Sequence, residues 1–248
     1  MSLRVRDLPS PNQDDRPADT PIDMLILHYT GMPTAQAAID RLRDPRSGMS
    51  AHYVVEEDGS VLRLVPEARR AFHAGVSYWR GHTALNGRSI GVEIVNPGHA
   101  WGYRDFPVLQ LAVVCDLCLD ILSRHDIPAR NVVAHSDVAP DRKQDPGERF
   151  GWRSLAENGV GMWPATIAAP GGPGLVASTV LHVRAALREI GYQVVAEGDL
   201  DGALATVLRA FQRHWRPEAI TGEADAGTLV RLDGVRQLLK ESCRVHGA

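Results

Sequence analysis

The segment Asn-Val-Val-Ala-His-Ser-Asp, residues 131–137, is a short apolar run that ends on a histidine and is followed by a polar loop. Far earlier in the chain, Met-Leu-Ile-Leu-His-Tyr, residues 24–29, has the same form. Short apolar runs bounded by turn residues predict buried strands. We therefore expect His135 and His28 at the ends of two strands, with Asp145, in the polar loop, folded back toward His135.

Two histidines and one carboxylate are a usual ligand set for catalytic zinc, which binds nitrogen and oxygen donors at about 2.0–2.2 Å and keeps one position open for water. Such a site keeps one net positive charge, which lowers the pKa of bound water to roughly 7. His28, His135 and Asp145 are therefore candidate ligands of a Zn²⁺ cofactor. Each also has a structural interpretation, as a hydrogen-bonded histidine at a strand end or as a turn aspartate before Pro-Gly.

The composition is that of a globular protein with a substantial core. The chain has 248 residues, of which 44% are hydrophobic and 23% charged, enough for one large domain and a small one. Its net charge of -3 provides no general attraction to nucleic acid. No apolar run approaches the roughly 20 residues that span a bilayer. We expect a monomer with no nucleic-acid partner and no transmembrane segment.

We expect no signal peptide in the N-terminal residues. Residues 1–21 lack the apolar region of a signal peptide, which predicts a cytoplasmic protein. A chain with a trimmed N-terminus would look the same, so the alternative is the periplasm or the cell envelope. The four prolines of this segment predict a flexible leader over residues 1–20.

Strand-like and helix-like segments alternate over residues 21–160. Thr34 is placed to cap the first helix, and Asp58-Gly59 between two β-branched segments is a strong hairpin signal. This order predicts an α/β fold in which a mixed central β-sheet is flanked by helices. The expected strands cover residues 24–28, 51–57, 60–64, 89–95 and 131–135, and the expected helices cover residues 34–43 and 105–125.

The longest expected helix begins at Asp105 and ends near His125. Its apolar residues predict a stripe that faces the core. The Cys-x-x-Cys pair, Cys115 and Cys118, lies within this helix, and no second pair is present to complete a zinc knuckle. We expect buried thiols there. The predicted stripe comprises positions 108, 111, 112, 115, 118, 119 and 122.

The C-terminal third is predicted to form a separate helical domain. Glycine, proline and alanine dominate near residues 161–174, which predicts a linker. Beyond it we expect a small all-α three-helix domain over residues 175–240 and a tail over 241–248. Its helices are expected at 180–190, ended by Gly191, at 201–215, capped by Asp201, and at 225–232, capped by Asp225.

Four motifs in order resemble the N-acetylmuramoyl-L-alanine amidases of the type 2 amidase family, over roughly residues 20–165. They are Leu-His-Tyr-Thr (27–30), Ile-Gly-Val-Glu-Ile-Val-Asn (90–96), Val-Ala-His-Ser-Asp (133–137) and Lys-Gln-Asp-Pro-Gly (143–147). The resemblance implies the peptidoglycan-recognition-protein fold and a zinc amidase domain over residues 21–160. It also implies that the three candidate ligands bind zinc and that Glu93 and Lys143 serve catalysis.

The implied catalytic roles make physical sense. Strand alternation sends Glu93 to the face opposite Ile90 and Val92, where a carboxylate can accept a proton from water and pass it to a leaving amine. Lys143 can stabilise charge that develops on the carbonyl oxygen. The residues alone also permit a solvated glutamate and a plain loop lysine. His73, which matches a family loop near the cleft, and Asn96 are candidate substrate contacts.

The C-terminal segment resembles peptidoglycan-binding domain 1 modules in Gly-Asp-Leu-Asp-Gly (198–202) and nearby motifs. The alternative is a purely structural cap. The whole chain is thus expected to hydrolyse the amide between N-acetylmuramic acid and L-alanine in peptidoglycan or muropeptides. The alternatives are a non-catalytic peptidoglycan recognition module of the same fold and a zinc peptidase that cuts within the stem peptide.

Overall fold

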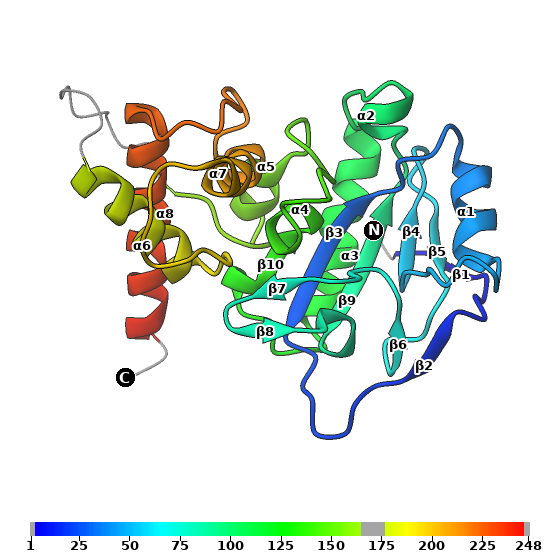
Figure 1. Ribbon diagram of the computed structural model, residues 1–248. Coiled ribbons are helices and arrows are strands. Elements are labelled where there is room, and N and C mark those ends of the chain that lie inside the picture. Colours follow the sequence, from blue (N-terminus) through cyan, green and yellow to red (C-terminus); the bar gives the residue numbers. More distant parts are fainter. Residues whose placement is uncertain (1–2, 165–176, 246–248) are drawn as a thin grey trace.

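The structure, a computed structural model, describes residues 3–164 and 177–245. Its centre is a mixed six-stranded sheet with strand order β1-β5-β4-β9-β3-β10 (Figure 1). The β4–β5 pair is antiparallel and the other neighbours are parallel, so the predicted mixed sheet is confirmed. The strands are β1 (Val5–Asp7), β3 (Met24–Tyr29), β4 (Tyr53–Val55), β5 (Val61–Arg63), β9 (Ser89–Ile94) and β10 (Val132–Ala134).

The parallel centre of the sheet determines where the site forms. Strand β3 lies between β9 and β10, and all three run in the same direction. Parallel strands present their carboxyl ends at one edge of the sheet, where α/β proteins place their ligands. His28 and Glu93 are paired at this edge, and His135 follows the last residue of β10.

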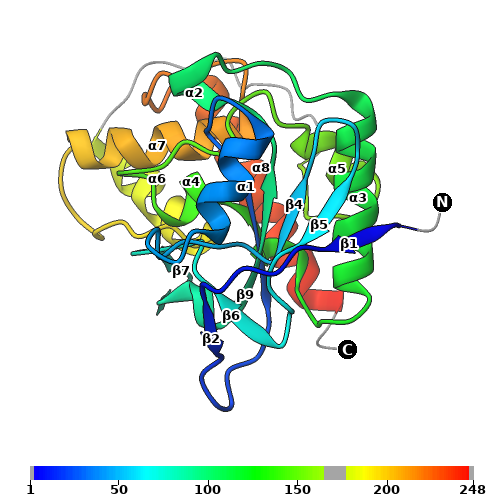
Figure 2. The same cartoon turned by 90° about the vertical axis from the view of Figure 1, so that its right-hand side faces the viewer.

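Helices cover both faces of the sheet. Helix α3 (Val108–Leu122) packs against one face, and α1 (Ala35–Arg43) packs against the opposite face of β4 and β5. Figure 2 shows α1 and α3 on opposite sides of these strands. The shorter elements are α2 (Gly98–Trp101), α4 (His135–Val138), α5 (Trp152–Glu157), β6 (Arg69–Ala71), β7 (Tyr78–Trp79), β8 (His82–Thr83), and the 3-10 turns Leu85–Gly87 and Ala129–Asn131.

Two local predictions are confirmed at the level of hydrogen bonds. The hydroxyl of Thr34 accepts from the backbone N–H of Ala37 at 3.1 Å and caps α1. Strands β4 and β5 form an antiparallel hairpin around Asp58 and Gly59. Gly59 has a φ of 83°, a left-handed conformation that glycine adopts without strain.

Helix α3 differs from its prediction at its start and in its buried face. It begins at Val108, after Pro107, rather than at Asp105. The predicted stripe was wrong, because Val108 is 86% exposed and Leu119 is also exposed. Almost every position of this helix is apolar, so the pattern does not single out one face. The buried side chains are Gln110, Val114, Leu117, Cys118 and Ile121, and the predicted stripe contains only Cys118 of these.

Burial of a glutamine in this helix explains part of that error. The amide of Gln110 donates to the carbonyls of Val55 and Val95, at 3.1 and 2.9 Å, and these contacts compensate its loss of water. Of the two cysteines, Cys118 is buried and Cys115 is partly buried, and both are free thiols.

The N-terminal segment contributes two strands, whereas its proline content predicted a flexible leader. Strand β1 extends the sheet beside β5, and β2 (Gln13–Asp15) pairs with β6. Prolines are tolerated beside an edge strand such as β1, because few ladder hydrogen bonds are lost there. Ion pairs of Asp14 with Arg70 and of Asp15 with Arg69 hold β2 in place.

The C-terminal part contains α6 (Ala177–Ile190), α7 (Gly202–Trp215) and α8 (Ala226–Val245). Asp201 caps α7 as predicted, while α8 extends well past the predicted end at 232 and into the predicted tail. The linker predicted at 161–174 lies mostly outside the described residues. Helices α6 and α7 share a hydrophobic cluster with Met24 and Ile26 of β3. The division of the chain into two domains stays a prediction.

No helix in the described part of the chain is long and apolar enough to cross a membrane.

Candidate active site

Three predicted ligands meet at the carboxyl edge of the sheet. His28 is near the end of β3, His135 is the first residue of α4, and Asp145 lies on the loop that follows α4. The two Nδ1 atoms are 2.8 Å apart, and Oδ2 of Asp145 lies 3.1 Å from His28 Nδ1 and 3.0 Å from His135 Nδ1. All three side chains are buried. Residues separated by more than 100 positions are thus brought to one point.

The geometry of this cluster suits a small divalent cation. Tetrahedral ligands at about 2.0 Å from zinc are roughly 3.3 Å from one another, close to the three separations observed here. The donor set of two imidazole nitrogens and one carboxylate oxygen is also typical of zinc. Among the described residues, this is the one His, Cys, Asp or Glu group found with ligand atoms close enough to share an ion.

The remote ring nitrogens of both histidines are held by hydrogen bonds. His135 Nε2 lies 3.2 Å from the carbonyl of Ala74, and His28 Nε2 lies 3.1 Å from His73 Nδ1. A carbonyl can only accept, so the proton of His135 is on Nε2 and its Nδ1 lone pair is free. Hydrogen bonds of this kind select the tautomer of a metal-binding histidine.

A chain of hydrogen bonds continues behind His28. His73 Nε2 lies 3.2 Å from the hydroxyl of Ser89, which donates to the carbonyl of Leu85 at 2.7 Å. The serine oxygen therefore accepts from His73 Nε2–H, and His73 Nδ1 accepts from His28 Nε2–H. This series of hydrogen bonds, which runs from Leu85 through Ser89 to His73, leaves the Nδ1 lone pair of His28 directed at the cluster.

Position 91 in β9 requires glycine, because the hydrogen-bonded ring of His73 lies against it. A Cβ added to Gly91 would lie 2.4 Å from the ring of His73, closer than two carbon atoms approach. The imidazole of His73 therefore packs directly on the backbone of β9. This contact explains the glycine of the Ile-Gly-Val-Glu motif.

The electrostatics of the cluster favour the protonation states that bind a metal. Burial lowers the pKa of His28 to about 4, and the charge of His135 acts in the same direction. Burial alone would raise the pKa of Asp145, but the charge and hydrogen bonds of the two histidines hold it below its usual range. At neutral pH His28 is neutral and Asp145 is ionised, as metal ligands must be.

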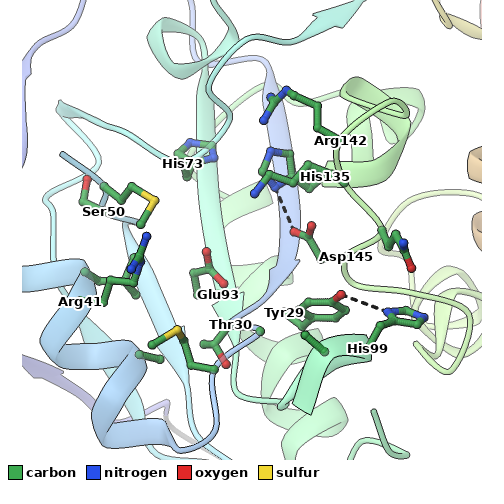
Figure 3. A pocket seen from close by; sticks show the side chains of 18 of the residues that line it. Tyr29, Thr30, Arg41, Ser50, His73, Glu93, His99, His135, Arg142 and Asp145 are labelled. Carbon is green, nitrogen blue, oxygen red and sulfur yellow. Dashed lines mark hydrogen bonds and ion pairs between the residues drawn. The ribbon is translucent and has the colours of Figure 1, made fainter. Parts of the chain in front are cut away.

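Glu93 faces the pocket from the neighbouring strand. Figure 3 shows its carboxyl group across the pocket from His135 and Asp145. Its Oε2 is buried without a hydrogen-bond partner. Burial raises the pKa of Glu93 well above its usual value, Asp145 raises it further, and Lys143 opposes both. Strand alternation therefore places Glu93 on the predicted face.

The cluster opens into a cavity of about 410 Å³. Lys143, predicted from the sequence, lines this cavity. Arg142, which was not predicted, donates to the carbonyls of Ala74 and Val76 and braces the loop beside His135 (Figure 3). Other lining residues not singled out beforehand include Tyr29, Thr30, Arg41, Phe72, His99 and Gln144.

The two predicted substrate contacts occupy different positions. His73 lines the cavity but is only 8% exposed, and both of its nitrogens are engaged. Asn96 is 1% exposed and is not among the residues that line the cavity. Its amide donates to the carbonyl of Arg104 and accepts from the N–H of Gly98, so it supports the loop after β9.

A mixed α/β sheet with a buried His-His-Asp cluster in an open pocket is typical of metal-dependent hydrolases. A family model described as N-acetylmuramoyl-L-alanine amidase matches residues 18–148. The chain belongs to this amidase family.

Individual relatives agree with this assignment. The N-acetylmuramoyl-L-alanine amidase AmiD of Escherichia coli K12 is 37% identical, over 84% of this chain and 79% of its own length. The 1,6-anhydro-N-acetylmuramyl-L-alanine amidase AmpD of the same organism is 36% identical, over 60% of this chain and 88% of its own.

Solved structures show the same fold over most of the chain. A complex of E. coli AmiD with anhydro-N-acetylmuramic acid-L-Ala-D-γ-Glu-L-Lys has a TM-score of 0.77 at 34% identity, covering 91% of this chain and 93% of that one. AmpDh3 of Pseudomonas aeruginosa has a TM-score of 0.78 at 31% identity, covering 92% and 96%. These matches extend over the C-terminal helices as well as the sheet.

Proposed function

We propose that the protein is a zinc-dependent amidase that hydrolyses the bond between N-acetylmuramic acid and L-alanine in peptidoglycan or muropeptides. The convergence of His28, His135 and Asp145, the last two of which line an open cavity, carries this proposal. Membership of the amidase family and the substrate named in the AmiD complex support the choice of bond. When bound there, Zn²⁺ supplies Lewis acidity, which polarises a carbonyl group and eases the ionisation of water at neutral pH.

Glu93 is assigned the proton transfer. Its unpartnered Oε2 is available to accept a proton from the attacking water and to return it to the nitrogen of the departing L-alanine. A carboxyl group with a raised pKa exchanges protons more readily near neutral pH than an ordinary glutamate does, a service typically worth about 10²–10⁴ in rate.

Lys143 is assigned the stabilisation of charge. It lines the same cavity, and its positive charge acts on both Glu93 and His28. A fixed ammonium group beside the scissile carbonyl stabilises the negative charge that develops on the oxygen, and such groups typically contribute about 3 kcal/mol.

His73 and Asn96 take different places in this proposal. The two nitrogens of His73 are already used, so we assign it to the support of His28 and not to substrate contact. Asn96 holds the loop beside the cavity through hydrogen bonds of its side chain to the backbone of Gly98 and Arg104. The resemblance of the C-terminal helices to peptidoglycan-binding modules stays a prediction, which binding of the protein to intact sacculi tests.

Replacement of Glu93 by glutamine tests the mechanism. We expect Glu93→Gln to retain one zinc ion per chain and to lose about 10²–10⁴ of the turnover of anhydro-N-acetylmuramic acid-L-Ala-D-γ-Glu-L-Lys. Zinc is measured by elemental analysis and products by mass spectrometry. The control Glu57→Gln changes a glutamate outside the cavity.

The same experiment separates the alternatives. A free tripeptide and anhydro-N-acetylmuramic acid as products support the amidase, whereas a muramyl-L-alanine product identifies a peptidase. Binding of the substrate by the zinc-loaded wild type without turnover identifies a recognition module. Unchanged turnover by Glu93→Gln excludes Glu93 from the chemistry.

A further inference from the structure

A second cavity, of about 260 Å³, lies beside the catalytic one. Its wall combines the loop after α4 with one face of α7. Arg142, Lys143 and Gln144 line both cavities, so the two are neighbours along this loop. In Figure 1, α7 lies next to α4. The residues that line the second cavity are Pro140, Asp141, Arg142, Lys143, Gln144, Thr206, Arg209 and Arg213.

This second cavity is strongly basic. Arg209 and Arg213 are four residues apart and therefore project from the same face of α7. With the residues that the structure describes, neither forms an ion pair, and the same holds for Lys143. Asp141 is the one acidic residue in the cavity wall. Several cations share a small space with little compensation from the protein.

Arg213 is partly buried, whereas Arg209 is exposed. The Nε of Arg213 is buried without a hydrogen-bond partner. Burial lowers the pKa of Arg213, with the charge of Glu148 acting in the opposite direction. Burial of an unpartnered nitrogen of a cationic group is costly unless an anion accompanies it. A guanidinium group in this situation suits a ligand carboxylate, which it can bind through two parallel hydrogen bonds.

Arg213 lies close to the catalytic cavity. Arg213 lines the second cavity together with Lys143, and Lys143 also lines the catalytic cavity. The pKa of Glu148 is lowered, chiefly by its hydrogen bond with His99, and the charge of Arg213 acts in the same direction. Arg213 therefore lies on the side of α7 that faces the loop after α4.

We propose that Arg209 and Arg213 form a subsite that binds a free carboxylate of the stem peptide. This assignment rests on the proposed function. In the ligand of the AmiD complex the glutamate is linked through its side chain, which leaves its α-carboxylate free one residue beyond L-alanine. An extended residue spans about 3.5 Å, so this carboxylate lies within roughly 7–10 Å of the scissile bond. The two cavities adjoin through Arg142, Lys143 and Gln144.

Peptide binding tests the subsite without turnover. The zinc-loaded protein is titrated with the tripeptide L-Ala-D-γ-Glu-L-Lys and with the same peptide carrying an α-amide on the glutamate. Charge-assisted hydrogen bonds predict that the wild type binds the free acid about tenfold or more tightly. We expect Arg209→Gln and Arg213→Gln each to reduce this preference and the double variant to abolish it. The control Arg188→Gln changes an exposed arginine of α6 and keeps the preference.

Two binding results would overturn the subsite. One is equal affinity of the wild type for both peptides, including no binding of either. The other is a double variant that still prefers the free acid. If the double variant does not fold, the single variants test the subsite instead, and an undiminished preference for the free acid in both of them would overturn it.

Turnover separates the subsite from the proposed function. With anhydro-muramyl tripeptides in acid and amide forms, we expect the double variant to raise KM for the acid alone and to keep kcat. If the wild type cleaves neither substrate yet binds the free acid preferentially, the hydrolysis is refuted and the subsite remains. If the wild type cleaves both substrates, and the double variant has the same KM as the wild type for each of them, the subsite is refuted and the hydrolysis remains.

Discussion

His73 acts on the candidate metal site through its neighbour. Its ring accepts from His28 Nε2 on one side and donates to the hydroxyl of Ser89 on the other. Because Ser89 donates to a backbone carbonyl, the direction of every hydrogen bond in the chain is determined. The outer partners of metal ligands orient the ring and raise its basicity. His73 is therefore expected to strengthen metal binding.

Removal of the nitrogens of His73 should weaken the metal site. We expect His73→Phe, which preserves the ring and its packing, to raise the zinc dissociation constant about 10–100-fold, the usual effect of losing an outer partner. Competition with a chelator measures this constant. His82→Phe, at an exposed position in β8, is the control. Equal zinc affinity of the two variants would show that the chain behind His28 has no role in binding.

At the scale of elements, Glu67 joins the sheet to the end of α3. Its carboxylate accepts from the hydroxyl of Tyr53 in β4 and from Arg124 and His125 just after α3. Burial alone would raise the pKa of Glu67, but these hydrogen bonds lower it from 4.5 to about 2. The carboxylate thus stabilises the docking of α3 on the sheet while it is ionised.

This network predicts a specific loss of stability in acid. A depressed carboxyl pKa contributes stability above about pH 4.5, and that contribution is lost as the pH falls toward 2. We expect Glu67→Gln to lower the free energy of unfolding by about 1–2 kcal/mol at pH 7, because solvent screens part of the network. The deficit should shrink as the pH falls from 4.5 toward 2.

Denaturant unfolding at several pH values measures this change. Glu157→Gln is the control, because Glu157 pairs with Arg153 on the exposed surface of α5. A deficit that stays constant between pH 7 and pH 3 would exclude the ionised carboxylate as its source.

At the scale of the whole molecule, Asp137 connects the sheet to the C-terminal helices. It lies two residues after His135, and its side chain accepts from the backbone N–H of Ala134. The same carboxyl group accepts from the hydroxyl of Tyr192 at 2.5 Å and from Nδ1 of His214 at 2.6 Å. All of these groups are buried. The turn that presents His135 is thus braced by residues of α7 and of the segment after α6.

Loss of one of these hydrogen bonds should destabilise the protein. Tyr192→Phe leaves one contact of a buried carboxyl group unmade, and hydrogen bonds to such groups are worth about 1.5–3 kcal/mol. We expect the free energy of unfolding to fall by that amount, measured by urea denaturation. Tyr78→Phe is the control, because no hydrogen bond of its hydroxyl is found in the described structure. Equal stability of Tyr192→Phe and the wild type would contradict this role of the junction.

Local patterns predicted much of the fold and the central residues of the site. The apolar run before His28, the Asp58-Gly59 turn and the cap at Thr34 each depend on neighbours within a few residues. In contrast, α3 is apolar at most of its positions, so its periodicity could not identify the buried face. The N-terminal strand β1 gave no local signal either, because its pairing with β5 is a contact between distant residues.

The sequence by itself determined the strand ends that carry His28 and His135, the alternation that turns Glu93 inward, and the family of the motifs around them. Tertiary structure alone decided that His73 and Ser89 stand behind His28, that Asp137 meets Tyr192 and His214, and that Arg209 and Arg213 lie beside Lys143. The reason is physical. Periodicity and caps act between neighbours in the chain, whereas these contacts join segments whose approach depends on how the whole core packs.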